Sequence, residues 1–168
     1  MSKKHLVAWA SVLVGLTAFT ILPATAARAD PTNVHSKGAH ASQLGTVQID
    51  PGDPRVASVT GRYSCPAGEA HLWVSVKQVA DARPDNALKE EGSSAISAAW
   101  LERHPGPGEF TCDGTWHTGT WQIDSFSEYG FGSLVPGQVY AQVCWTGPAT
   151  GPFEFAWYAF AEQFANAR

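Results

Sequence analysis

Hydrophobic and polar side chains alternate along most of the chain from residue 45 onward. Between residues 55 and 65, Ala57, Val59 and Tyr63 share one parity, and Ser58 lies on the other. Because successive side chains of a strand point to opposite faces, this pattern predicts a strand with one buried face. The same alternation predicts further strands over 45–50, 70–78, 116–123, 139–145 and 153–161.

Two segments fit more than one structure. Residues 93–104 carry apolar side chains spaced for a short helix that Pro105 and Gly106 would end, with a short edge strand as the alternative. Residues 153–164 fit both a strand and a helix. The regular strand spacing upstream favours a final strand to about Ala161, followed by a frayed tail.

Turn sequences separate the predicted strands. They are Pro51-Gly52, Pro66-Ala-Gly68, Asp113-Gly114 and Val135-Pro-Gly-Gln138. Short strands with turns between them predict an all-β fold, an immunoglobulin-like two-sheet β-sandwich of about seven strands over residues 44–163. Residues 30–43 have neither a strand nor a helix period, so we expect a flexible arm there.

The first 29 residues have the features of a signal peptide. Lys3 and Lys4 precede an uncharged run from Leu6 to Leu22, and small residues surround a cleavage site after Ala29. The apolar run is short for a membrane anchor, which is the alternative. We therefore expect a secreted, extracellular protein that does not remain in the membrane after cleavage.

The charge balance bears on the partners. Removing Lys3, Lys4 and Arg28 with the leader lowers the basic residues from 11 to 8, against 15 acidic ones, a net charge of −7. A negative chain is repelled by nucleic acids and anionic membrane surfaces, so we expect neither as a partner.

Enzyme signatures are absent from the sequence. There is no Gly-x-Ser-x-Gly, His-Glu-x-x-His, Walker loop or dinucleotide motif, and we predict no cofactor and no metal. Asp113 and His117 could form an acid–base pair or bind a metal, but a turn aspartate and a lone histidine usually have structural roles. A small secreted hydrolase with a site near Asp113 and His117 is the catalytic alternative.

Several short motifs resemble a known family. They are Thr60-Gly-Arg-Tyr-Ser-Cys65, Cys112-Asp-Gly-Thr-Trp-His117 and Pro136-Gly137 before a strand. They resemble secreted actinobacterial immunoglobulin-like domains of unknown function, over roughly residues 45–145. The resemblance implies a β-sandwich, a disulfide between Cys65 and Cys112, and no catalysis. Cys144 and the aromatic C-terminal segment depart from the family pattern.

The three cysteines also allow another pairing. A Cys65–Cys144 bridge would be similar to the bridge between the sheets of antibody domains, and it stays open as an alternative. If Cys144 is free, its strand parity places it on the outer face, where an exposed thiol is a liability. We then expect either that the aromatic C-terminal segment covers it or that it joins two molecules.

Outward-facing aromatic residues are the best functional candidates. In an immunoglobulin-like layout Trp73 and Tyr140, with Tyr158 if the final strand continues the alternation, would lie on the outside of one sheet. Such rings can stack on sugars or on a partner protein, unless residues 80–107 or the end of the chain cover them. We predict a monomeric, non-catalytic binding module for an unknown extracellular protein or glycan. A passive cell-envelope component is a further alternative.

Overall fold

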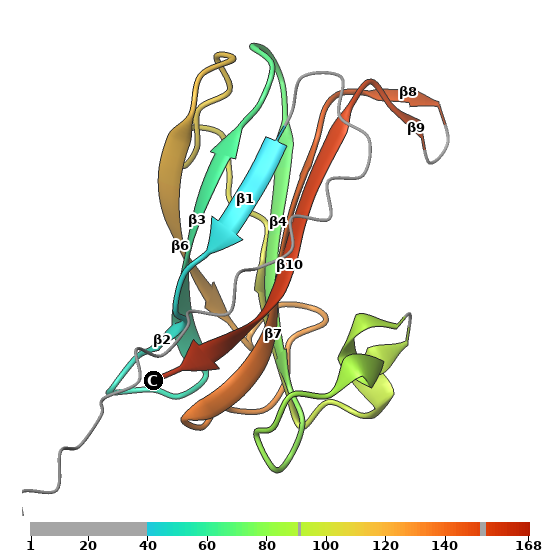
Figure 1. Ribbon diagram of the computed structural model, residues 1–168. Coiled ribbons are helices and arrows are strands. Elements are labelled where there is room, and N and C mark those ends of the chain that lie inside the picture. The colour runs from blue at the N-terminus through green and yellow to red at the C-terminus, as the bar shows by residue number, and fades with distance from the viewer. Residues whose placement is uncertain (1–39, 91, 152–153) are drawn as a thin grey trace, which may run out of the picture.

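The computed structural model describes residues 40–90, 92–151 and 154–168 (Figure 1). The predicted signal peptide and most of the predicted flexible arm lie outside these residues. The arm's last residues belong to the first strand, which begins at His40, so the folded region starts earlier than expected. None of the helical segments described is long and apolar enough to cross a membrane.

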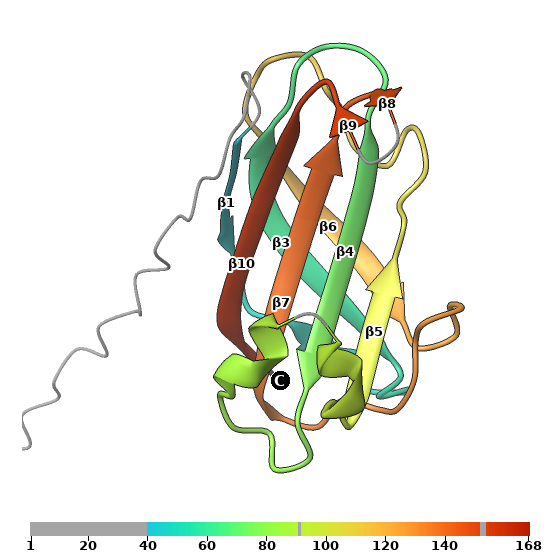
Figure 2. The same cartoon turned by 90° about the vertical axis from the view of Figure 1, so that its right-hand side faces the viewer.

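The strands form a curled antiparallel sheet, which confirms the predicted all-β class. Their order in the sheet is β1 (His40–Leu44), β3 (Val56–Ser64), β6 (His117–Asp124), β5 (Ala99–Arg103), β4 (His71–Gln78), β7 (Gly137–Thr146) and β10 (Tyr158–Ala167). The short β2 (Gln48–Ile49) pairs with β3 beside β1. Figure 2 shows β3 and β6 behind β4, β7 and β10.

The sheet is held together unevenly around its curl. A single residue pair, Glu102 with Asp124, joins β5 to β6. At the two edges of the sheet, Val47, which follows β1, pairs in parallel with Ala167 near the end of β10. The amide of Val47 donates to the Asn166 carbonyl over 3.0 Å, and that of Ile49 donates to the Arg168 carbonyl over 2.9 Å. These bonds bring the two margins of the sheet together.

The hydrophobic core lies inside the curl, on the predicted parity of each strand. Val139, Ala141, Val143 and Trp145 of β7 are all buried, as are Ala57, Val59 and Tyr63 of β3. The Tyr63 and Trp145 rings stack with centroids 4.8 Å apart, and Trp121 meets Trp145 edge-on at 5.5 Å. Burying an aromatic side chain of this size contributes about 4–6 kcal/mol of gross hydrophobic free energy.

Residues 79–98, between β4 and β5, form an insertion that packs on the outer face. We use that term for the surface of β10, β7, β4 and β5 turned away from the core. Two 3-10 turns lie in the insertion, Asn86–Lys89 and Ser93–Ala95. Asp85 caps the first by accepting from the amide of Ala87 over 3.0 Å. Figure 2 shows both turns across one end of β4 and β7.

The predicted short helix over 93–104 is wrong for most of its length. After the 3-10 turn, residues 99–103 form β5, which pairs with β4 from Val74 to Gln78. Ala99 and Leu101 point into the core, and Trp100 points outward. Trp100 is held there by two backbone hydrogen bonds with Phe131, 2.8 and 2.9 Å long. A strand forms here because it adds a hydrogen-bonded partner to β4 and buries the side chains of Ala99 and Leu101.

The C-terminal segment is a strand, as predicted, but it begins and ends later than expected, and the predicted frayed tail is part of it. It runs from Tyr158 to Ala167 and pairs with β7 along its whole length. Before it, β8 (Ala149–Gly151) and β9 (Glu154–Phe155) form a small separate hairpin. Trp157 is buried, and its carbonyl accepts from the amide of Gly147 over 2.8 Å. This hairpin lies at the opposite end of the outer face from the insertion (Figure 2).

Candidate functional site

Strand register places the outward side chains in rows across β10, β7 and β4. One row contains Phe160, Cys144 and Trp73, and the next contains Tyr158, Thr146 and His71. Trp73 therefore faces outward, as its parity predicted. Because the insertion packs at the far end of these strands, this end of the outer face stays accessible.

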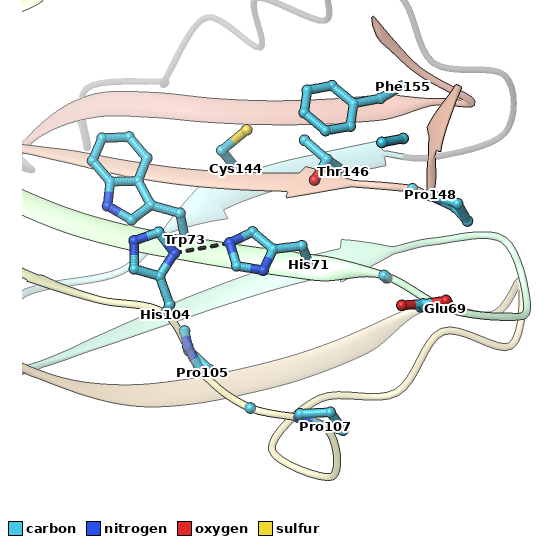
Figure 3. Close-up of a pocket in the computed structure, with 14 residues that line it drawn as sticks. Glu69, His71, Trp73, His104, Pro105, Pro107, Cys144, Thr146, Pro148 and Phe155 are labelled. Atoms are coloured by element: carbon cyan, nitrogen blue, oxygen red, sulfur yellow. Dashed lines mark hydrogen bonds between the residues drawn. The ribbon is translucent and has the colours of Figure 1, made fainter. Parts of the chain in front are cut away.

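A cavity of about 570 Å³ opens on this accessible end. Its walls come from the β4 and β7 members of the two rows, the segment before β4, the segment after β5 and the segment after β7 (Figure 3). The lining residues that carry chemistry are Glu69, His71, Trp73, His104, Cys144 and Thr146, and Phe155 closes the side nearest the hairpin. Cys144 lies between the Trp73 and Phe155 rings in the view of Figure 3. Size, apolar walls and a few polar groups are typical of a ligand site.

Two histidines form the polar edge of the cavity. His71 Nε2 and His104 Nδ1 are 2.8 Å apart in a hydrogen bond between the start of β4 and the residue after β5. One nitrogen must donate and the other accept, so at least one ring is neutral while the bond exists. Burial, and secondarily the charge of His104, lower the pKa of His71. The pair therefore presents uncharged His71 to the cavity at neutral pH.

A buried carboxyl fixes the orientation of Trp73. The indole Nε1 donates to Glu102 Oε2 over 2.7 Å, and Glu102 is only 3% exposed. His104 Nε2 is 3.9 Å from the same oxygen. Glu102 thus stands behind two lining residues and holds the indole against the wall, because an indole has a single donor and here it is engaged.

Cys144 is the free cysteine, and it forms part of the cavity wall. Burial raises the pKa of its thiol to about 11. The neutral thiol is a poor nucleophile, so at neutral pH Cys144 contributes packing. The predicted bridge between Cys65 and Cys112 is present, with Cα atoms 4.8 Å apart.

The prediction that Tyr140 binds a ligand requires correction. Its side chain points to the outer face, as expected, but it is 0% exposed. Val79 and Leu88 of the insertion cover it, together with Phe164 of β10. Its hydroxyl donates to Glu162, and burial first and this bond second raise its pKa. The third outward aromatic residue, Tyr158, is 37% exposed.

Asp113, in the turn before β6, and His117, the first residue of β6, lie together elsewhere. Asp113 Oδ1 accepts from the Thr115 amide over 2.8 Å, from the Thr115 hydroxyl over 2.7 Å and from His117 Nε2 over 2.8 Å. The His117 bond, then those from Thr115, lower the pKa of Asp113 to about 2. The Thr115 hydroxyl lies 3.1 Å from His117 Nε2, the same ring nitrogen that bonds to the Asp113 carboxylate. In a hydrolase triad the hydroxyl and the carboxylate bond to different nitrogens of the histidine ring. The cluster is built as a turn.

Metal-ligand clusters were also considered. Within the described ranges, no three His, Cys, Asp or Glu side chains are placed to hold a metal ion together. In the His71–His104 pair, the two facing ring nitrogens are hydrogen-bonded to each other.

Comparisons with known proteins place this chain beside none of them: no family model, no curated protein and no solved structure matches it. The interpretation of the cavity therefore depends on its own geometry.

The sequence pattern singles out Trp73 but not the two histidines beside it. His71 has the same parity as Trp73 in the predicted strand, so the pattern already placed it on the outer face. His104 could not be placed, because residues 93–104 fit both a short helix and a short edge strand. The register of β5 on β4 brings His104 to His71.

Proposed function

We infer that the chain is an exported, monomeric, non-catalytic binding module whose ligand occupies the cavity beside Trp73. The single observation that carries this function is that cavity, on the end of the outer face that the insertion leaves accessible. An oriented indole at its wall offers a large apolar surface at little cost in side-chain entropy. The ligand is an extracellular glycan or a segment of an extracellular protein.

An immunoglobulin-like β-sandwich is part of this proposal. Strand pairing supports two antiparallel groups, one that contains β3 and β6 and one that runs β5, β4, β7 and β10. A single residue pair joins the two groups. Such groups are typical of immunoglobulin-like sandwiches. The Cys65–Cys112 disulfide supports export, because disulfides persist in oxidising compartments.

Binding to a glycan array and to extracellular proteins of the producing organism tests the function. We expect Trp73→Ala to lose at least tenfold in affinity for any partner found, since a buried aromatic contact is worth about 1.4 kcal/mol or more. Tyr140→Phe is the matched control, because Tyr140 lies on the same face but beneath the insertion.

The alternative outcomes are equally clear. Binding that Trp73→Ala leaves unchanged would remove the cavity as the ligand site. Product formation from a bound substrate would show that the protein is an enzyme. Absence of any partner would favour a passive envelope component.

A further inference from the structure

We propose that the chemical group recognised by the cavity is an organic ammonium, a positively charged nitrogen carried on an apolar body. This inference rests on the proposed function, since it concerns the same cavity. It goes further by choosing the charge and the chemical class of the ligand from the residues that line the site.

The charges around the cavity favour a cation. Glu69 is the formally charged residue in the lining, which contains neither lysine nor arginine. Glu102 stands behind Trp73 and His104, buried from water, and across the described residues His104 is the basic group within 4.0 Å of it. A buried carboxyl without a lysine or arginine partner projects its field into the neighbouring cavity, where water screens it poorly.

The aromatic walls favour the same ligand. A cation is attracted to the face of an aromatic ring, most strongly to an indole. The hydrogen bond from Trp73 Nε1 to Glu102 strengthens this attraction, because donation to a carboxyl increases the electron density of the ring. Phe155, 46% exposed, supplies a second ring at the far side of the cavity.

Elsewhere the protein's own cations occupy such rings. In the described ranges a lysine or arginine lies over Phe126, Trp116, Trp100 and Phe164, at 4.7–5.4 Å from the ring centroid. Trp73 and Phe155 are not among these rings. Their side chains line the cavity instead, so a cation from outside can take the position that Lys77 takes over Trp100.

The histidine pair makes the site sensitive to pH. While His71 is uncharged, the imidazoles can contact an ammonium ligand without repelling it. Protonation of His71 places a positive charge at the cavity wall, directly beside His104. The other titratable groups facing the pair are Glu69, Glu102 and the neutral Cys144 thiol. Affinity for a cation therefore falls as the pH falls.

The test uses choline and its uncharged isostere 3,3-dimethylbutan-1-ol, which have the same shape. Binding is measured on the full chain by isothermal titration calorimetry, and in the parent protein the NMR signal of the Trp73 indole N–H places the bound compound in the cavity. At pH 8 we expect choline to bind at least about fivefold more tightly than the isostere, the range of a single cation–π contact. As acid protonates His71, we expect this preference to decrease.

Three variants separate charge from shape. Trp73→Leu should abolish the preference for choline. Glu102→Gln keeps an acceptor for the indole N–H and removes the negative charge, so it should reduce choline binding several-fold and leave the isostere unchanged. Tyr129→Leu, an exposed aromatic residue outside the cavity lining, should change neither.

The two proposals fail differently. Equal binding of choline and the isostere in the cavity would overturn the ammonium inference and leave the binding function standing. The same holds if neither compound binds but a neutral glycan or protein partner depends on Trp73. If neither compound binds and no partner depends on Trp73, both proposals fall.

Discussion

Replacing both cysteines of the Cys65–Cys112 bridge by alanine should destabilise the protein by about 4 kcal/mol. The bridge closes a loop with a sequence separation of 47 residues. Removing it frees the unfolded chain, and the loop-entropy relation gives about 4 kcal/mol at 25 °C for a loop of this length. That is a large part of the roughly 5–15 kcal/mol by which a typical domain is stable.

Urea unfolding monitored by tryptophan fluorescence measures the effect. With slopes of about 1–3 kcal/mol per molar urea, the midpoint should fall by roughly 1–4 M. The slope itself should increase, because the unfolded chain without its bridge is more expanded. Cys144→Ala is the control and should cost only about 1 kcal/mol, since that thiol closes no loop.

Two results would refute this reasoning. One is a double variant that unfolds at the same urea concentration as the parent protein. The other is a Cys65–Cys144 peptide recovered after digestion without reduction, which would mean that the bridge closes a different loop.

Three further predictions concern packing and pH. Gly119→Ala should destabilise by about 1–3 kcal/mol, since its Cβ would lie 2.2 Å from Cζ2 of buried Trp121; thermal unfolding tests this. Leu88→Ala should cost about 2–5 kcal/mol and expose Tyr140, which solvent-perturbation spectroscopy detects. Because the pKa of His71 is depressed in the folded protein, its contribution to stability is complete above pH 6.5 and is lost as the pH falls through the folded-state pKa. The stability of the His71→Phe variant should therefore fall less steeply with acid between pH 7 and 4. An unchanged acid slope would contradict the third.

The alternation of side chains predicted which residues of each strand face the core. Val139, Ala141, Val143 and Trp145 are buried because strand geometry gives them no other direction, and a single strand contains that information. β5 could not be recognised because its outer side carries Trp100, an apolar residue partly covered by Lys77 and Phe131, next to Glu102, so apolar and polar residues do not alternate cleanly.

The accessibility of the outer face could not be predicted in the same way. Trp73 and Tyr140 have equivalent parity on neighbouring strands, and the sequence ranked them together. They differ because Leu88 of the insertion packs on Tyr140, whereas the Trp73 end of the face opens into the cavity. Which end an insertion covers depends on tertiary contacts of residues far apart in the chain, and no local pattern records it.

The parallel seam between residues 47–49 and the end of β10 has a mechanical consequence. Its hydrogen bonds include those from the amides of Val47 and Ile49 and from the amide of Arg168 to the Val47 carbonyl. Tension that pulls residue 47 toward the start of the chain and Arg168 away from it would move these two segments in opposite directions along their length. The bonds would then carry the load together and not open one after another. A module built this way would resist traction on these two segments.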